Sequence, residues 1–340
     1  MTVLVEKKLP LLVVLGPTAV GKTDLSVDLA ETMHTEIVSG DSMLLYRGFD
    51  IGTAKPTVEE RRGVPHHLID ILDGTESYSV MDFQREAAAC IARIAGKGKI
   101  PILAGGTGLY VKALLEGYQF NQAEEHPAFR TAMRQRVEAE GKETVYRLLE
   151  QQDPKAAAEI DPQNFRRVVR ALETVRYGGE SISRQRAGST QNTLVYHALV
   201  LGLHRDRQAL YARINRRVER MFADGLVAEV RHLLTRGIAR NAPAMKGIGY
   251  KETAAYLAGE ITREQAVERI QTNTRHFAKR QLTWYRRMPY IHWIDVDGLT
   301  REELLRKALY EAEGFFPFFS NKNNQKAKIG EQLGGNRPCQ

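Results

Sequence analysis

The fold is decided by the apolar run Leu9-Pro-Leu-Leu-Val-Val-Leu15 and the glycine-rich stretch after it, Gly16-Pro-Thr-Ala-Val-Gly-Lys-Thr23. A short, continuous apolar run that ends at a glycine fits a strand buried on both faces of a parallel sheet. The glycine-rich stretch matches the pattern G-x-x-x-x-G-K-[S/T], and apolar residues at helical spacing follow it between Asp24 and Met33. Strand, loop and helix in this order predict a phosphate-binding loop within an α/β fold.

In such a loop, the backbone N–H groups turn inward around an anion, and the helix N-terminus adds a favourable potential. We predict that Lys22 reaches two phosphate oxygens and that the Thr23 hydroxyl holds Mg²⁺. The predicted diphosphate-binding residues are Gly16, Pro17, Thr18, Ala19, Val20, Gly21, Lys22 and Thr23. The loop alone does not indicate whose diphosphate is bound.

Beyond this loop, segments that suit strands alternate with segments that suit helices. Further strands are predicted at 36–39, 67–72, 100–104, 195–202 and 291–296, and helices at 79–95, 206–236 and 262–287. Between about 121 and 189 only helices are predicted, at 127–140, 142–152, 154–160 and 164–177. Alternating strands and helices imply right-handed crossovers and ligands at the carboxyl ends of the strands. The predicted fold is a P-loop NTPase-like, doubly wound parallel sheet with an all-helical insertion.

The predicted division of the chain follows from these segments. Residues 1–120 and 195–313 form the α/β core, residues 121–194 the helical insertion, and residues 314–340 a tail rich in Asn, Lys, Gln and Gly. The tail has no apolar periodicity, so we expect it to be disordered.

Composition and charge narrow the class of protein. The 340 residues include only two cysteines, Cys90 and Cys339, which argues against a disulfide framework, a cysteine-rich zinc site or an iron–sulfur cluster. No long apolar segment suggests a membrane span, so we expect a cytoplasmic protein. Of the net charge of +8, residues 201–313 contribute an excess of seven basic side chains. That excess suggests a polyanionic partner, and a solvated helix surface is the alternative.

Asp41 follows the predicted strand at 36–39 and lies at the same edge of the sheet as the phosphate loop. A carboxylate in this place could hold Mg²⁺ through water, or act as a general base toward a group attacking the bound substrate. A turn-forming aspartate is the third interpretation. The position alone leaves all three open.

Longer motifs extend the pattern through most of the chain. They are Asp41-Ser-Met-Leu-Leu-Tyr-Arg-Gly-Phe-Asp-Ile-Gly-Thr-Ala-Lys-Pro56, Val64-Pro-His-His-Leu-Ile-Asp70, Gly105-Gly-Thr-Gly-Leu-Tyr110, Lys246-Gly-Ile-Gly-Tyr-Lys251 and Lys279-Arg-Gln-Leu-Thr-Trp284. Together they resemble the tRNA dimethylallyltransferases (isopentenyltransferases) over roughly the first 310 residues. The resemblance implies transfer of a dimethylallyl group from its diphosphate to N6 of the adenosine immediately 3′ of the tRNA anticodon.

The resemblance also implies roles for single residues. Asp41 would be the base, Thr107 would bridge the reacting base and the diphosphate, and Lys22 would stabilise the leaving group. The tRNA-binding residues would be Asp41, Ser42, Met43, Leu44, Thr107, Arg130, Arg166, Arg167, Arg170, Lys246, Gly247, Ile248, Gly249, Tyr250 and Lys251. Among these, Arg166 and Arg170 are four apart on one helix face, and Tyr250 suits base stacking.

Three other functions stay open at this point. An adenylate isopentenyltransferase would use the same donor with a free nucleotide as acceptor, and a small-molecule kinase would hold ATP in the loop. An RNA-binding protein switched by a nucleotide is the third. The helical insertion and the basic second half favour tRNA, with its anticodon stem-loop, as acceptor and dimethylallyl diphosphate as donor. We expect Mg²⁺ as cofactor, no membrane partner, and a monomer.

Overall fold

The computed structural model describes residues 8–119, 126–178 and 193–317. The chain forms two compact units, here called the core unit (Met1–Leu115 and Leu194–Gln340) and the helical unit (Glu116–Thr193). Each unit is described by itself. Within the described ranges, no helix is both long and apolar enough to cross a membrane.

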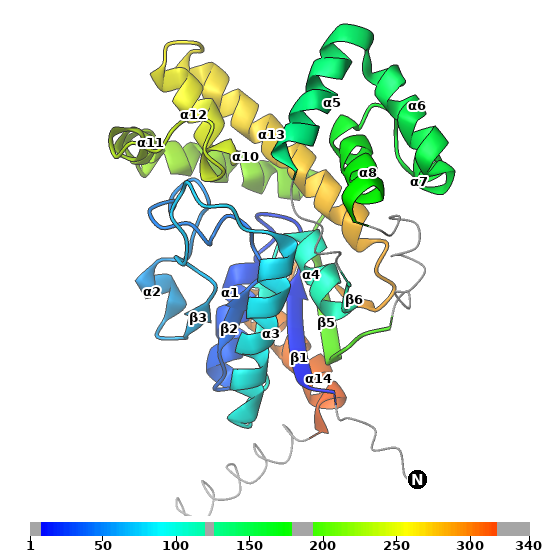
Figure 1. Ribbon diagram of the computed structural model, residues 1–340. Helices are drawn as coiled ribbons and strands as arrows, with labels where there is room; N and C mark the ends of the chain where they lie inside the picture. Colours follow the sequence, from blue (N-terminus) through cyan, green and yellow to red (C-terminus); the bar gives the residue numbers. More distant parts are fainter. Residues whose placement is uncertain (1–7, 120–125, 179–192, 318–340) are drawn as a thin grey trace, which may run out of the picture. The chain divides into compact units, whose positions relative to one another are not determined.

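The core unit is built on one parallel sheet of six strands (Figure 1). The strands are β1 (Pro10–Leu15), β2 (Ile37–Ser39), β3 (His66–His67), β4 (Ile102–Gly105), β5 (His197–His204) and β6 (Ile291–Asp295), in the spatial order β3-β2-β4-β1-β5-β6. β1 lies between β4 and β5, with Leu15 opposite Gly105 on one side and Gly202 on the other. The predicted parallel α/β sheet is confirmed, and the phosphate loop leaves its centre.

Helices cover both faces of this sheet. Alternate residues of β1 enter separate apolar clusters, with Val13 in one and Val14 in the other, and both are fully buried. The first cluster includes residues of α3 (Val80–Gly96), α4 (Gly108–Leu115), α11 (Leu226–Thr235), α12 (Tyr250–Leu257) and α13 (Arg263–Tyr285). The second includes residues of α1 (Lys22–Thr32), α10 (Arg207–Ala223) and α14 (Arg301–Phe315), and both α10 and α13 contribute residues to both clusters. The sheet is therefore doubly wound, as predicted.

Three expectations for the core unit are wrong. The strand predicted at 67–72 is reduced to the two residues of β3, because Leu68 and Asp70 take positive φ angles of 60° and 57°. The helix predicted at 206–236 is two helices, α10 and α11, because Gly225 adopts φ 105° between them. The tail does not begin at residue 314, since α14 extends to Phe315 and Phe316 is 3% exposed. Residues 318–340 lie outside the described part of the chain.

The helical unit contains α5 (Pro127–Glu140), α6 (Lys142–Gln152), α7 (Pro154–Glu159) and α8 (Phe165–Tyr177). Its own apolar cluster joins Phe129, Val145, Leu149 and Leu172. Asp153 and Asn164 cap α7 and α8 by accepting hydrogen bonds from backbone N–H groups of the first turn. The four predicted helices are confirmed to within one residue at each end.

Candidate active site

The glycine-rich loop forms a turn between β1 and α1 at the carboxyl edge of the sheet. Gly16 and Gly21 have φ angles of 152° and 113°, and Ala19 takes a left-handed conformation with φ 64°. α1 begins directly at Lys22, whose Nζ donates to the carbonyl oxygen of Pro17 at 2.9 Å. The loop has the strand–loop–helix geometry that suits an anion.

Lys22 lies in an electrostatically unusual place. Burial lowers the pKa of its ammonium group from 10.5 to about 8. The negative charge of Asp41 opposes this shift, and the positive charge of Arg217 adds to it. Because burial disfavours the charged form of Lys22, an anion that enters the loop stabilises that charged form.

The loop after β2 brings Asp41 to the same edge. Asp41 Oδ1 accepts the Met43 N–H at 2.9 Å, so one carboxylate oxygen forms the turn that the sequence allowed for. The Thr107 hydroxyl accepts the Ser42 N–H at 3.0 Å and lies 3.2 Å from Ser42 Oγ. The structure thereby places Thr107 against the Asp41–Ser42 turn, although 65 residues separate Thr107 from Ser42 in the chain.

Gly106 lies between the phosphate loop and Asp41, and Lys22, Asp41 and Gly106 line the same cavity. A Cβ atom built on Gly106 would lie 2.7 Å from Gln281 Nε2, 3.4 Å from Asp41 Oδ2 and 3.9 Å from Lys22 Nζ. A side chain at this position would collide with Gln281 and crowd the carboxylate and the ammonium group. Glycine therefore lets Gln281, Asp41 and Lys22 lie close together around the cavity.

Two cavities of the core unit adjoin this space, and Lys22, Thr23 and Arg217 line both. The smaller, of about 100 Å³, has an apolar side formed by Ile37, Leu44, Ile69, Ala104 and Phe277. The larger, of about 870 Å³, is bordered by four arginines of α10, which are Arg213, Arg216, Arg217 and Arg220. The first can receive a small apolar group. The second has six basic side chains against four carboxylates (Asp24, Asp50, Glu60 and Asp224), an excess of positive charge that favours an anion.

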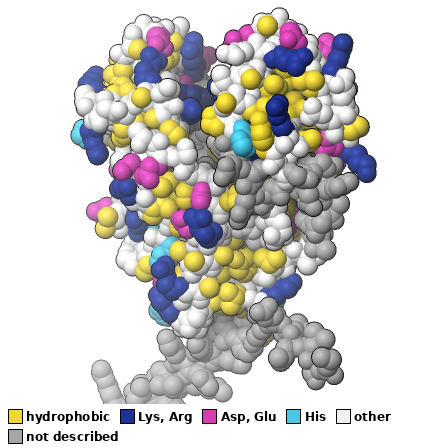
Figure 2. Space-filling view, in the orientation of Figure 1, with side chains coloured by type: hydrophobic (Ala, Val, Ile, Leu, Met, Phe, Trp, Pro, Cys, Tyr) yellow, Lys and Arg dark blue, Asp and Glu magenta, His cyan; other side chains and the backbone are white. Residues whose placement is uncertain are grey.

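The α10 arginines were not predicted as site residues. Arg213 Nε donates to the carbonyl oxygen of Ala19 at 2.9 Å, which fixes α10 against the phosphate loop. Burial lowers the pKa of Arg217. On the face shown in Figure 2, basic and acidic side chains are interspersed instead of gathering in a patch of one sign. The sequence signal was a row of arginines at 213, 217 and 220, which flanks the apolar stripe of the helix on one side.

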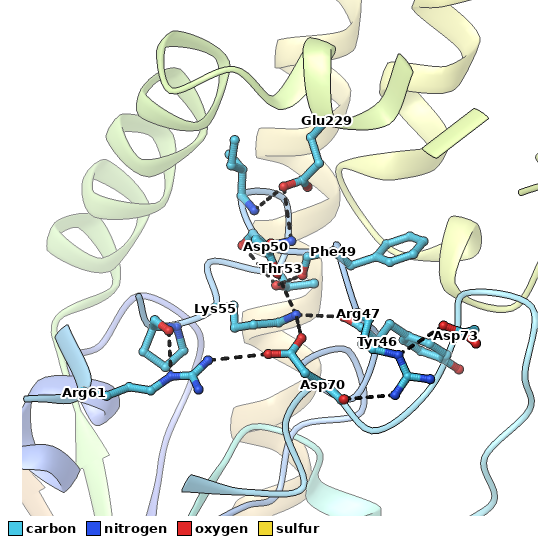
Figure 3. A network of polar contacts seen from close by, with 12 residues as sticks. Tyr46, Arg47, Phe49, Asp50, Thr53, Lys55, Arg61, Asp70, Asp73 and Glu229 are labelled. Carbon is cyan, nitrogen blue, oxygen red and sulfur yellow. Dashed lines mark hydrogen bonds and ion pairs between the residues drawn. The ribbon is translucent and has the colours of Figure 1, made fainter. Parts of the chain in front are cut away.

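A polar network supports the loop of residues 50–57, which borders both cavities (Figure 3). Lys55 is buried, with a side chain 3% exposed, and its Nζ donates to the Tyr46 carbonyl oxygen and to Asp50 Oδ1, each at 2.7 Å. It also pairs with Asp70, which takes a positive φ in the segment after β3. Thr53, Ala54 and Pro56 of this loop line the smaller cavity. The network therefore fixes one wall of the site.

Glu229 of α11 holds the same loop from the other side. Its carboxylate accepts the N–H groups of Asp50, Ile51 and Gly52 at 3.2, 2.7 and 3.2 Å, and the Tyr250 hydroxyl donates to it at 2.7 Å. Tyr250 is fully buried against Phe49, with ring centroids 4.8 Å apart. The expectation that Tyr250 stacks on an RNA base is wrong, because its ring anchors the loop.

The other residues predicted at 41–44 and 246–251 lie together. A Cβ atom on Gly247 would lie 2.5 Å from the terminal methyl of Met43, so these segments are in direct contact. Lys246 and Lys251 are exposed beside them. The contact joins the segment that carries Asp41 to a segment with two exposed cations.

Within the helical unit, the four predicted arginines divide into two pairs. Arg130 and Arg170 both donate to Glu173 Oε2 at 2.8 Å, and the Glu173 side chain is completely buried. Burial raises the pKa of Glu173, but hydrogen bonds from Arg130, the His126 N–H and Arg170 outweigh it and lower the pKa to about 2. Arg166 and Arg167 are exposed on α8. The first pair stabilises the unit, and the second is available to an anionic partner.

Comparison with known proteins identifies the family. The family described as IPP transferase matches residues 44–288, most of the chain and entirely after the phosphate loop. A tRNA dimethylallyltransferase of Bacillus subtilis is 45% identical over 303 residues, covering 89% of this chain and 96% of the relative. The chain belongs to the tRNA dimethylallyltransferase family. A second member, from Thermomicrobium roseum, is 47% identical over 302 residues, covering 89% of this chain and 91% of the relative.

Solved structures of tRNA dimethylallyltransferases share the fold. The full-length tRNA isopentenylpyrophosphate transferase of Bacillus halodurans is similar with a TM-score of 0.69 and 41% identity, covering 93% of this chain and all of that one. A eukaryotic dimethylallyltransferase acting on tRNA is similar with a TM-score of 0.74 and 27% identity, covering 98% of this chain and 81% of that one. The resemblance inferred from the motifs is confirmed.

Proposed function

We propose that this chain transfers a dimethylallyl group from dimethylallyl diphosphate to N6 of the adenosine immediately 3′ of the anticodon of tRNA, releasing diphosphate. The names of its relatives support the reaction class. The observation that carries the proposal is the smaller cavity, which both Lys22 and Asp41 line. A departing anion and an attacking amine need groups of these opposite charges.

The chemistry follows from these residues. The bond between the allylic carbon and the diphosphate oxygen breaks, and its electron pair leaves with the diphosphate. The N–H groups of the phosphate loop, Lys22 and Arg217 stabilise that charge. The N6 lone pair forms the new bond to carbon, and Asp41 accepts the proton that N6 gives up. Asp41 Oδ2 is the oxygen for this role, because Oδ1 accepts the Met43 N–H.

We propose the smaller cavity as the place of the five-carbon group. Its apolar side chains exclude water from a carbon centre that carries positive charge during transfer. Thr107, held on the Ser42 turn, lies on the acceptor side.

Mg²⁺ fits this site through oxygen ligands only. The described residues contain no group of three or more His, Cys, Asp or Glu side chains placed to hold a metal. Thr23 lines both cavities beside Lys22, and its hydroxyl would hold the ion together with diphosphate oxygens and water. When bound, Mg²⁺ would neutralise part of the charge on diphosphate.

For the acceptor, we propose contacts to RNA phosphates from Arg166 and Arg167 in the helical unit and from Lys246 and Lys251 in the core unit. We also propose that the chain is a cytoplasmic monomer. Light scattering of the purified protein measures its molar mass and so tests the monomeric state.

The test uses an unmodified tRNA transcript, dimethylallyl diphosphate and Mg²⁺, followed by digestion and mass spectrometry of the nucleosides. The proposal predicts one adenosine that has gained C5H8, located beside the anticodon, and an equal amount of diphosphate. In a parallel reaction, AMP replaces the tRNA as the acceptor. Modification of AMP with no change in the tRNA would identify an adenylate isopentenyltransferase instead, and a phosphorylated product with ATP would identify a kinase.

A further inference from the structure

Gln281 of α13 links two parts of the site that are far apart in the chain. Its side chain is buried, with the residue 5% exposed. The Thr18 N–H of the phosphate loop donates to Gln281 Oε1 at 2.9 Å, and Gln281 Nε2 donates to the carbonyl oxygen of Gly106 at 2.8 Å. Both partners are backbone groups of fixed polarity, so the amide can lie in only one orientation. One side chain thus connects the phosphate loop to the turn after β4.

The connection continues from Gly106 to the acceptor side. The next residue, Thr107, donates its N–H to the Gly40 carbonyl oxygen at 3.2 Å, and its hydroxyl accepts the Ser42 N–H. A displacement of the Gly106 peptide therefore reaches the turn that presents Asp41. The path from Thr18 to Ser42 consists of hydrogen bonds with defined donors and acceptors at each step.

We propose that Gln281 is a positioning residue that couples the donor site to the acceptor site, so that diphosphate in the loop and RNA beside Thr107 strengthen each other's binding. The proposal rests on the proposed function. A ligand that orders the phosphate loop also fixes Thr18, and through Gln281 it fixes the Gly106–Thr107 turn. The second ligand then has less ordering to impose, and the effect is reciprocal.

The chain offers a matched control at Tyr285, one turn further along α13. The Tyr285 hydroxyl donates to the same Gly106 carbonyl oxygen at 2.9 Å, and the residue is fully buried. Tyr285 supports the turn, but it has no hydrogen bond to the phosphate loop among the described contacts. Tyr285→Phe therefore removes support from the turn and a contact with the Gln281 side chain, but it keeps the two hydrogen bonds that join Gln281 to Thr18 and Gly106. Gln281→Met keeps the length of the side chain and removes both bonds of the link.

The experiment measures the affinity of an unmodified anticodon stem-loop RNA with and without saturating inorganic diphosphate and Mg²⁺. The ratio of the two affinities is the coupling. We expect at least about a fivefold ratio for the wild type, a similar ratio for Tyr285→Phe, and a ratio near one for Gln281→Met. Gln281→Glu, which can still accept the Thr18 N–H but cannot donate to Gly106, is also expected to give a ratio near one.

Three results would overturn the coupling role. They are a wild-type ratio of one, an unchanged ratio in both Gln281 variants, and a loss in Tyr285→Phe as large as in Gln281→Met. The last would show that rigidity of the turn alone matters. Failure of the proposed function would be recognised separately, as absence of RNA binding or of modified adenosine with the wild-type protein. Thermal unfolding of each variant shows whether it is folded, and Gln281→Glu serves if Gln281→Met is not.

Discussion

Raising the pH should weaken diphosphate binding, because the pKa of Lys22 is lowered to about 8 by burial. A group with this pKa is charged in about nine tenths of the molecules at pH 7 and in about one tenth at pH 9. If diphosphate binds only to the charged form, its apparent dissociation constant rises about tenfold between these pH values. The bound anion returns the proton to Lys22, so binding at pH 8 takes up about half a proton.

Isothermal titration calorimetry with inorganic diphosphate and Mg²⁺ measures the dissociation constant. Repeating it in buffers of different ionisation enthalpy gives the number of protons taken up on binding. Lys22→Arg is the control, because a guanidinium group does not titrate in this range. Diphosphate itself becomes more negative in alkaline solution, which acts in the opposite direction and is present in both proteins. The difference between wild type and Lys22→Arg therefore isolates Lys22.

The charges of Asp41 and Arg217 determine in which direction substitutions at these residues shift the pH at which diphosphate affinity falls. Asp41 raises the pKa of Lys22 and Arg217 lowers it. Asp41→Asn should thus move the fall in affinity to lower pH, and Arg217→Gln should move it to higher pH. The same pH dependence of affinity from pH 7 to 9 and the same proton uptake in wild type and Lys22→Arg would refute the electrostatic account of this loop.

Three further predictions concern single contacts. Asp41→Asn should retain diphosphate binding and lower turnover by about two to four orders of magnitude, since a carboxamide cannot accept the N6 proton; rapid-quench assays with tRNA measure this, and wild-type turnover would exclude the base role. The pKa of Glu173 is about 2 in the folded protein and 4.5 in an unfolded chain, so its carboxylate stabilises the fold above pH 4.5, and this stabilisation is lost as the pH falls toward 2. Glu173→Gln should remove this pH-dependent stabilisation. Acid titration followed by circular dichroism should show that the variant loses less stability with falling pH than wild type, and parallel curves would contradict the prediction. Arg166→Ala with Arg167→Ala should weaken RNA binding and reduce its salt dependence while diphosphate affinity stays unchanged; an unchanged salt slope would place the RNA contacts elsewhere.

Local patterns in the sequence predicted the parts of the fold that local interactions determine. The four helices of the helical unit begin and end almost where apolar spacing and the Pro and Gly residues placed them. The phosphate loop was predictable because its glycines and Lys22 act within eight residues of chain. Asp41 could be named because it follows a strand at the carboxyl edge, where parallel strands bring their ends together, whereas Thr107 was named from the resemblance to the family.

What the sequence could not predict depends on distant partners. The run at 67–72 has strand composition, but Leu68 and Asp70 take positive φ angles, and the Asp70 and Ile71 N–H groups donate to the carbonyl oxygens of Leu44 and Leu45, far back in the chain. Gln281 is one polar residue in a helix of many, and its role depends on Gly106, 175 residues earlier. Tyr250 has the side chain of a stacking residue, and only its burial against Phe49 shows that it anchors the loop.

The central claim is that carbon is transferred and the phosphate loop releases an intact diphosphate. Two samples of dimethylallyl diphosphate, one labelled in an allylic carbon and one in phosphorus, test it directly when each is incubated with protein, Mg²⁺ and unmodified tRNA. The account predicts that the carbon label enters the tRNA and that all of the phosphorus label is recovered as free diphosphate. Phosphorus label in the tRNA, or in any product other than diphosphate, would contradict it.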